Sequence, residues 1–298
     1  DRTGAMTAGA SGTAATAAGA DPGADMRDTT VLPLAEAPVL PLADLAPARL
    51  DEVVAEAALL TRVDRKYLVP MDIAVSALDR LDPATRVLEI DGLRDFGYDS
   101  VYFDTPDRLS YRLTAQRRRR RFKLRTRSYL DTGTSFLELK TKSGRGATVK
   151  DRIPCDPADR ARITEAGGSY IAELLGRHGH DPGLVGELRP CLVSRYRRAT
   201  LVVPGGTRVT VDTGLSWAEP GGDSLELPHY AIIETKSASA AGEFDRRLWR
   251  LGHRPSGISK FGTGTAALRP ELPNNKWARA LRGPFTGSAT RTTREGTR

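Results

Sequence analysis

Charged residues alternate with uncharged ones at a period of two along several stretches of this chain, which is typical of β-strands. In residues 123–127, three cations are separated by Leu124 and Thr126. The same spacing is found in residues 138–142 and 234–236. Successive side chains of a strand point to opposite faces, so each set of charges falls on one face. The sequence therefore predicts several strands with a strongly cationic face.

The wider pattern predicts an α+β protein. Further strands are expected over residues 62–69, 86–90, 96–104, 122–129, 135–142, 148–154, 189–203, 208–212 and 230–237. Helices are expected over residues 48–60, 71–81, 156–178 (with a break at Gly167 and Gly168), 243–251 and 259–268, and a helix or turn over 106–115. Turn residues at 130–134 and 204–206 predict hairpins. The βαβ alternation of a parallel sheet is absent, which favours an antiparallel barrel or sandwich with flanking helices.

The ends of the chain differ in composition from its middle. Residues 1–30 are rich in Ala, Gly and Thr, and residues 31–47 repeat a Pro-Leu-Ala theme. We expect residues 1–47 to be a disordered segment with an extended lead-in, because they cannot bury enough apolar surface. One folded domain is expected over residues 48–270, and a disordered basic tail over residues 271–298.

Composition narrows the classes of partner. The 298-residue chain has a formal charge of +8 and a sequence pI of about 9.7, so we expect an acidic partner such as nucleic acid, an anionic membrane or phosphates. Aromatic residues make up 6% of the chain, which argues against a base-stacking platform for single strands. No apolar run is long enough to span a bilayer, and the start lacks the features of a signal peptide.

Cysteine and histidine usage points to an ordinary intracellular protein. Cys155 and Cys191 stand in separate segments without a CxxC motif, and we interpret them as two buried thiols in a reducing cytoplasm, with a disulfide as the alternative. The four histidines show no zinc-site spacing. We therefore predict a cytoplasmic location and no zinc site.

A charged strand face is usually the solvent face of a half-buried sheet. Here the residues on the opposite face are mixed, because Leu124 and Leu139 are apolar whereas Thr126, Thr141 and Thr235 are polar. Like charges on neighbouring strands repel unless an anion lies between them. Cations dominate the stretch 123–152, and they are Lys123, Arg125, Arg127, Lys140, Lys142, Lys150 and Arg152. An inward-facing surface of this kind would form a basic tunnel for a polyanion, or for a nucleoside triphosphate with a metal ion.

No glycine-rich phosphate loop is available in this chain. It has no GxGxxG after a strand and no GxxxxGK[ST]. Any bound nucleotide must therefore be held by side chains.

At this point the residues resemble those of a known family, the VTC domains. These are the polyphosphate polymerase domains of the vacuolar transporter chaperone complex and their bacterial relatives, which belong with the CYTH proteins to the triphosphate tunnel metalloenzymes. The resemblance covers roughly residues 55–268. Eight motifs carry it in order: Arg62–Val69, Val101–Thr105, Lys123–Tyr129, Phe136–Lys142, Ser194–Ala199, Arg208–Thr213, Ile233–Lys236 and Gly257–Phe261.

The resemblance implies a closed antiparallel barrel of about eight strands that binds ATP and polyphosphate and uses Mn²⁺ or Mg²⁺. Glu234 then corresponds to the metal ligand, with Glu138, Asp64 and Asp212 as residues that assist the metal or orient the lysines. Family members more often have Glu where Asp64 stands, which weakens a metal role for it. The implied phosphate-binding and catalytic residues are Lys66, Arg125, Arg127, Lys140, Arg198, Arg208 and Lys260, and Lys236 joins them as a binding residue.

Two further features have competing interpretations. The run Arg117–Arg121 is either a solvated basic loop or a funnel that attracts polyanions to the tunnel mouth. Trp217, Trp249, Trp277 and Tyr196 are interpreted as packing residues.

Three functions are consistent with these residues. The first is a metal-dependent polyphosphate polymerase that transfers the γ-phosphate of ATP to a polyphosphate chain, and a membrane-protein partner is compatible with it. The second is a triphosphatase of the same fold, in which Glu138 would matter more because water must be activated. The third is a non-catalytic module that binds polyphosphate or nucleic acid. Glu234 argues against the third, because a carboxylate in the groove weakens the binding of a polyanion.

Overall fold

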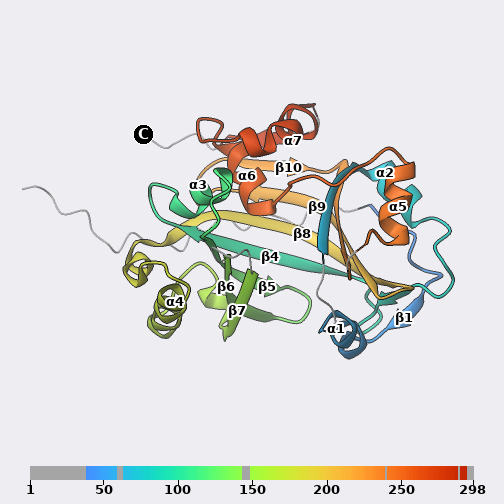
Figure 1. Cartoon of the computed structure of the whole chain (residues 1–298), viewed down its shortest axis with the longest axis horizontal. Coiled ribbons are helices and arrows are strands. Elements are labelled where there is room, and N and C mark those ends of the chain that lie inside the picture. The colour runs from blue at the N-terminus through green and yellow to red at the C-terminus, as the bar shows by residue number, and fades with distance from the viewer. Residues whose placement is uncertain (1–37, 59–62, 143–147, 239, 288, 294–298) are drawn as a thin grey trace, which may run out of the picture.

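The computed structural model describes residues 38–58, 63–142, 148–238, 240–287 and 289–293 (Figure 1). Its helices are α1 (Leu50–Ala58), α2 (Met71–Leu78), α3 (Leu109–Ala115), α4 (Glu165–Arg177), α5 (Glu243–Arg250), α6 (Lys260–Leu268), α7 (Ala278–Arg282) and α8 (Pro284–Gly287), with short 3-10 turns η2 (Pro157–Asp159), η3 (Pro182–Glu187) and η4 (Asn275–Trp277). Its strands are β1 (Ala46–Ala48), β2 (Val63–Pro70), β3 (Arg86–Leu88), β4 (Asp95–Asp104), β5 (Arg121–Tyr129), β6 (Thr134–Lys142), β7 (Thr148–Cys155), β8 (Arg189–Val203), β9 (Thr207–Ala218), β10 (Ser224–Leu227), β11 (Tyr230–Ser237) and β12 (Thr290–Thr292).

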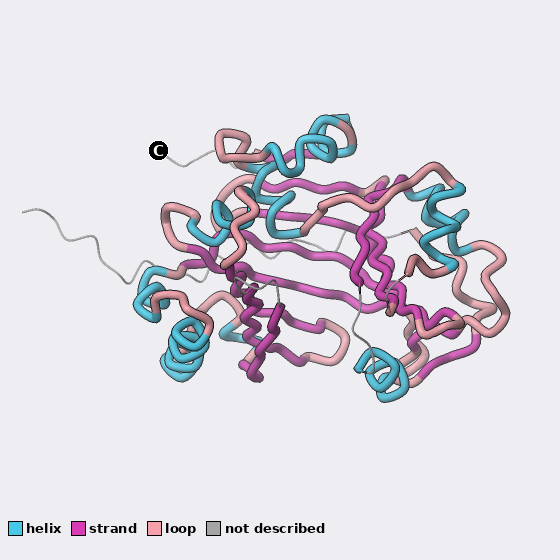
Figure 2. Tube along the Cα trace, viewed as in Figure 1, coloured by secondary structure: helices cyan, strands magenta, loops and turns pink. Residues whose placement is uncertain are grey.

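Eight of these strands form one continuous antiparallel path in the order β2-β11-β9-β8-β4-β5-β6-β7. The α+β class and the antiparallel pairing of these strands are thus as the sequence predicts. Strands β10 and β12 extend the sheet beside β9, and β3 with β1 extends it beside β8. Helices lie around the outside of the strands (Figure 2).

The closed barrel expected from the family resemblance is not observed. Within the described residues no ladder joins β2 to β7, so the path has two free edges. One edge has another partner: the backbone N–H of Ser256, in the segment between α5 and α6, donates to the carbonyl oxygen of Lys66 at 2.7 Å. A connecting segment therefore takes a hydrogen-bonding position along β2 that a neighbouring strand would use in a closed barrel.

Turn chemistry explains the hairpins that the sequence predicts. Gly133 lies between β5 and β6 with φ 64°, and Gly205 and Gly206 lie between β8 and β9 with φ 85° and 73°. Glycine adopts these left-handed conformations without the clash of a Cβ atom. Both hairpins are confirmed, and with them the register that sets the direction of each charged side chain.

The glycine pair at 167–168 does not break a helix as expected. Both glycines lie inside α4, which begins after Thr164, whose hydroxyl accepts a hydrogen bond from the Gly167 N–H at 3.2 Å. A Cβ atom on Gly167 would lie 3.0 Å from the side chain of Leu137 on β6. The glycine therefore allows α4 to pack closely on the outer face of the sheet.

Three clusters of apolar side chains hold the helices against the sheet. One cluster packs α2 and α5 against β2 and β11, and it includes Val69, Leu78, Ile233, Phe244 and Leu248. A second packs α4 against β5 and β6 and includes Leu124, Leu139, Ile171 and Leu175. A third joins α6 and η4 to β8 and β9 and includes Trp217, Phe261 and Trp277. The first two clusters lie on the outer face, whereas the third also contains Tyr102 and Tyr196, whose rings face the cations of the inner face.

The described residues near the two ends of the chain, within 38–47 and 271–293, are more ordered than composition predicts. Trp277 of η4 is buried, and β12 pairs with β10, so the described part of residues 271–293 is folded onto the domain. In the lead-in, Leu42 is buried and Arg94 donates to the carbonyl oxygens of Leu42 and Ala43. A few buried or hydrogen-bonded side chains are therefore enough to order segments that contain few apolar residues. The expectation for residues 1–37 lies outside the described residues.

Candidate active site

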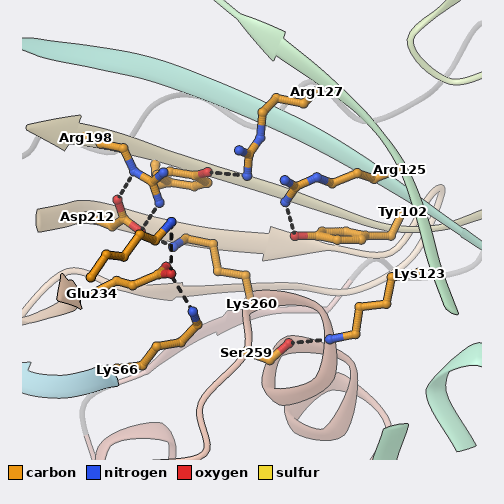
Figure 3. Close-up of polar contacts among 12 residues, drawn as sticks. Lys66, Tyr102, Lys123, Arg125, Arg127, Arg198, Asp212, Glu234, Ser259 and Lys260 are labelled. Carbon is orange, nitrogen blue, oxygen red and sulfur yellow. Dashed lines mark hydrogen bonds and ion pairs between the residues drawn. The ribbon is translucent and has the colours of Figure 1, made fainter. Parts of the chain in front are cut away.

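The strand register gathers the charged residues on one concave face. In the β5–β6 ladder, Lys123 faces Lys140 and Arg125 faces Glu138, while Lys236 of β11 faces Arg208 of β9. The sheet curves enough to bring its two ends together. Burial, followed by the charge of Lys66 on β2, lowers the pKa of Lys140 on β6. Figure 3 shows Lys66, Lys123, Arg125, Arg127, Arg198, Glu234 and Lys260 around one shared space.

Glu234 of β11 lies next to the edge strand β2, where it faces Lys66 in the ladder. One of its oxygens lies 2.9 Å from Nζ of Lys66, and the other lies 3.2 Å from Nζ of Lys236. Burial alone would raise the pKa of Glu234, but the charges of Lys66, Lys236 and Arg198 hold it well below its usual value. Glu234 is therefore an anion in a largely enclosed, cationic setting.

Asp212 of β9 is a second buried carboxylate with two cationic partners. Nε and Nη2 of Arg198 donate to its two oxygens at 2.6 and 2.8 Å, and Nζ of Lys260 donates to the same carboxylate. Burial tends to raise its pKa, but Arg198 and Lys260 lower it. The sequence left the role of Asp212 open between metal and orientation of lysines, and its contacts fit orientation.

Glu138 of β6 anchors two further cations. Arg125 donates two hydrogen bonds to one Glu138 oxygen at 2.9 and 2.6 Å, and Nζ of Lys150 on β7 lies 2.5 Å from the other oxygen. Burial opposes ionisation, but Arg125, Arg127 and Lys150 together lower the pKa of Glu138. In the sequence Lys150 stands out only as part of the cationic stretch, and the structure brings it to this site.

Arg127 keeps donors that no described residue uses. Its Nη2 donates to the Tyr196 hydroxyl at 3.1 Å, while its buried Nε has no hydrogen-bond partner within the described residues. A buried N–H without a partner is costly and is usually satisfied by a ligand or water. This guanidinium donor is therefore available to a ligand or to water in the interior.

A pair of stacked tyrosines is not predicted by the sequence. The rings of Tyr98 and Tyr196 stack with centroids 5.2 Å apart. Arg198 lies over both rings at 5.1 and 5.3 Å, and Nζ of Lys260 lies 4.1 Å from the Tyr196 centroid. The sequence interpretation of Tyr196 is packing; it is buried, but its ring and hydroxyl also face the cations. Tyr98 and Tyr102 lie four residues apart in one strand and therefore on the same face. This spacing in the sequence could have predicted aromatic rings beside the cations.

The start of α6 completes the site from the C-terminal side. Ser259 caps α6 by accepting from the Gly262 N–H at 3.2 Å, and its hydroxyl also accepts from Nζ of Lys123 at 3.1 Å. Trp217 donates through its indole N–H to the Lys260 carbonyl oxygen at 3.0 Å. These contacts fix the two residues that α6 presents to the interior. Burial comes first in lowering the pKa of Lys260, to about 8.

The remaining predicted site residues lie near the ends of their strands. Arg208 and Lys236 lie on the inner face at the far ends of β9 and β11, and burial lowers the pKa of Lys236 to about 8. Lys140 is exposed, and within the described residues it makes no ion pair with a carboxylate. Asp64 is exposed on β2, where it faces Lys236 in the ladder.

The carboxylates of the site could bind a divalent ion only together with phosphate oxygens and water. Within the described ranges no group of three or more Asp, Glu, His or Cys side chains lies close enough together to hold a metal. Mg²⁺ and Mn²⁺ can, however, be bound through one or two carboxylates with phosphate oxygens and water in the other positions. Glu234, ionised and with 14% of its side chain exposed, fits that role better than Glu138, whose side chain is 2% exposed.

Other sequence interpretations are settled in part. Trp217 and Trp277 are buried packing residues. Both cysteines are free thiols; Cys191 is buried, but Cys155 is only half-buried. No helix among the described residues is long and apolar enough to cross a membrane.

Comparison with known proteins decides the family. The family model described as the VTC domain matches residues 61–269. The chain belongs to the VTC domain family. The match to the family model confirms the resemblance that the eight sequence motifs carry. The matched residues of this VTC domain end before η4. No curated protein matches the chain.

Solved structures show more distant similarity. HpAC1 from Hippeastrum, assigned as an adenylyl cyclase and described as having a dominant triphosphatase activity, shares 19% identity at a TM-score of 0.43, covering 72% of this chain and 99% of its own. The PH1819 protein from Pyrococcus horikoshii shares 16% identity at a TM-score of 0.40, covering 70% and 99% respectively. This degree of similarity is too low to carry over any activity.

Proposed function

We propose that this VTC domain is a metal-dependent polyphosphate polymerase that transfers the γ-phosphate of ATP to the end of a polyphosphate chain. The observation that carries the proposal is the unpaired donor of Arg127 in an interior where cations outnumber carboxylates. Phosphoryl transfer depends mainly on positioning and on neutralising the charge of the phosphates. This interior supplies both requirements without any covalent step by the protein.

The residues divide by the geometry they offer to phosphate. Arg125, Arg127 and Arg198 present planar guanidinium groups that match two phosphate oxygens at once. Lys66, Lys123 and Lys260 present compact charges on the opposite side of the shared space (Figure 3). Glu138 and Asp212 hold several of these cations in place through the ion pairs described above. The other proposed phosphate ligands are Lys140, Arg208 and Lys236.

Glu234 would hold the divalent ion, which supplies charge neutralisation for the phosphate oxygens when it is bound. Lys66 and Lys236 keep the Glu234 carboxylate ionised and orient it toward the interior. Both carboxylates pair with cations through both oxygens, but Glu138 is the weaker candidate as a metal ligand, because its side chain is 2% exposed whereas that of Glu234 is 14% exposed.

The state of the carboxylates favours transfer to phosphate over hydrolysis. Hydrolysis by general base catalysis needs a carboxylate that can take a proton from water. The pKa values of Glu138, Asp212 and Glu234 are all lowered, because each carboxylate contacts two cations. Such carboxylates are weak bases, whereas a terminal phosphate oxygen of polyphosphate is already anionic and needs no base. A triphosphatase that uses the same cations is the second candidate.

The test is incubation of the purified protein with ATP and Mn²⁺, followed by phosphorus NMR of the products. A polymerase gives signals of internal chain phosphates together with ADP. Orthophosphate as the only released product would replace the proposal with a triphosphatase, and binding without turnover would replace it with a binding module. A reducing cytoplasm, where ATP is available and the two thiols stay free, is the proposed location.

A further inference from the structure

The cationic face does not stop at the interior. In the β5–β6 ladder Arg121 faces Lys142, two positions beyond the pair of Lys123 and Lys140 and on the same face. This places two more cations at the mouth formed by the start of β5 and the end of β6. A line of positive charge thus runs from the interior to the surface at this end of the hairpin.

A third cation comes from the segment beyond the family domain. Nζ of Lys276, in η4, donates to the carbonyl oxygen of Thr114 at 2.8 Å, and the backbone N–H of Arg117 donates to the same oxygen at 3.2 Å. Lys276 and Arg117 are therefore neighbours at the end of α3, which lies beside α6 (Figure 1). The VTC match ends at residue 269, so Lys276 lies beyond the matched residues.

The position of Lys276 is well anchored. The adjacent Trp277 is buried, and its indole N–H donates to the Gly257 carbonyl oxygen at 3.1 Å. Nζ of Lys276 also lies 5.3 Å from the centroid of the Trp277 ring. The ammonium group is thus held at the mouth, although it belongs to a segment whose composition resembles a tail.

The cations at the mouth have no carboxylate partner among the described residues. In the part of the chain that the structure describes, none of Arg117, Arg121, Lys142 and Lys276 forms an ion pair with a carboxylate. Burial and then the charges of Arg121, Arg117 and Lys142 lower the pKa of Lys276 to about 8. Gathering like charges costs free energy that a bound anion would recover.

The rest of the arginine run makes other contacts. Nε of Arg118 donates to the Gln116 side chain at 3.3 Å, and Nη1 of Arg120 donates to the Gly179 carbonyl oxygen at 3.3 Å. Residues 117–120 are all exposed, and Nη1 of Arg121 donates to the Arg118 carbonyl oxygen at 2.6 Å. The run therefore divides by position, because Arg117 lies beside Lys276 and Arg121 faces Lys142, whereas the side chains of Arg118 and Arg120 contact other residues.

We propose that Arg117, Arg121, Lys142 and Lys276 form a binding site for the part of a polyphosphate chain that extends beyond the triphosphate held inside. The proposal rests on the proposed function only in taking polyphosphate as the ligand. Arginine and lysine side chains spaced along a line suit a linear polyanion, because each successive phosphate offers oxygens to the next cation. A short ligand such as tripolyphosphate would fill the interior and leave this mouth unused.

The test compares two triple variants that remove the same charge from the same region. The mouth variant is Arg117→Gln, Arg121→Gln and Lys276→Met, in which Met keeps the apolar stem that packs beside Trp277. The control variant is Arg118→Gln, Arg119→Gln and Arg120→Gln. Binding of long-chain polyphosphate and of tripolyphosphate is measured by calorimetry at low and at high salt, and thermal unfolding checks that both variants fold.

We expect the mouth variant to bind long-chain polyphosphate about ten-fold or more weakly at low salt, with a smaller difference at high salt. Its affinity for tripolyphosphate should fall less than about three-fold, and the control should bind both ligands like the wild type within about two-fold. Equal losses in both variants, or a loss in neither, would overturn the proposal. An equal loss for both ligands would instead assign these residues to the triphosphate site. Failure to polymerise ATP, with the chain-length selectivity intact, would count against the proposed function alone.

Discussion

Nζ of Lys66 lies 2.9 Å from a carboxylate oxygen of Glu234, and the two residues face each other in the ladder between β2 and β11. Lys66 thus comes from an edge strand and Glu234 from its inner neighbour. Any anion or metal ion bound between them has to compete with this ion pair. The pair therefore couples the position of β2 to the state of the site.

Replacement of Glu234 tests the proposed metal ligand. Glu234→Gln removes one negative charge at nearly constant volume, so we expect Mn²⁺-dependent turnover of ATP to be lost while the protein stays folded. Metal-free binding of tripolyphosphate should be retained or tighter, because a repulsive carboxylate is gone. The measurements are steady-state ATP turnover against Mn²⁺ concentration and calorimetric binding without metal.

The matched control for this variant is Glu243→Gln. Glu243 lies on the exposed surface of α5 and pairs with Arg246 and Arg250 there, so its loss should leave turnover close to the wild type. Wild-type turnover by Glu234→Gln would show that Glu234 is not the essential ligand.

Arg127 tests whether guanidinium geometry or charge alone matters. Arg127→Lys keeps the charge but loses the planar fork and the unpaired Nε donor. We expect turnover to fall by about 30- to 1000-fold, which corresponds to roughly 2–4 kcal/mol of transition-state stabilisation. The control is Arg197→Lys, because Arg197 pairs with Asp95 away from the interior. Equal turnover in both variants would remove Arg127 from the proposed catalytic residues.

Asp212 tests the idea that carboxylates orient the cations. Asp212→Asn leaves Arg198 and Lys260 buried without their counter-charge, so we expect the free energy of unfolding to fall by about 3–5 kcal/mol. Tripolyphosphate should raise the melting temperature of this variant more than that of the wild type, because it restores negative charge beside the two cations. Denaturant and thermal unfolding with and without tripolyphosphate measure both effects. An unchanged stability would show that the pair of cations does not depend on Asp212.

The lowered pKa values of Lys236 and Lys260 predict that polyanion binding depends on pH. Burial is the main cause that lowers the pKa of Lys236 and of Lys260 to about 8, and a lysine is cationic only below its pKa. Affinity for tripolyphosphate should therefore fall as the pH rises from about 7 to about 9, while the arginines remain charged. Calorimetry across this range measures the effect, and Lys260→Met should weaken binding at pH 7 and flatten the profile. An affinity that rises with pH would contradict this assignment.

The lowered pKa values of Lys236 and Lys260 also affect the stability of the protein. Whereas the affinity for tripolyphosphate should fall as the pH rises, the free energy of unfolding should increase. The pKa of each lysine is lower in the folded protein than in the unfolded chain, so burying the charged form costs free energy below pH 8. Without ligand, this cost declines as the pH rises from about 8 toward the unfolded value of about 10.4. Wild-type stability should show this gain relative to Lys260→Met in unfolding measurements.

Gly262 tests the packing that positions α6. A Cβ atom at this residue would lie 2.1 Å from the ring of Trp277, which cannot move without displacing η4. Gly262→Ala should therefore lower the free energy of unfolding by at least about 1–3 kcal/mol. Thermal unfolding measures the loss, and Gly257→Ala is the control because no atom lies within 4 Å of its Cβ position. Equal stability of the two variants would show that α6 tolerates this contact.

The alternation of charges along the chain by itself determines much of the site. A period of two is a local property of a strand, so Lys123, Arg125 and Arg127 have to share a face wherever that strand is placed. The hairpin turns then set the register that brings Glu138 opposite Arg125. The charged face, most of the strands and the family motifs can all be predicted in this way.

Only the tertiary structure decided which distant segments meet around the charged face. The meeting of Tyr98 with Tyr196, of Lys150 with Glu138 and of Lys276 with Thr114 depends on contacts between segments whose pairing no local period encodes. Whether β2 would pair with β7 was equally undetermined, because backbone hydrogen bonds at a sheet edge carry little sequence information. Side-chain periodicity records which face a residue occupies, whereas the partner across a cavity is set by the curvature of the whole sheet and the helices packed outside it.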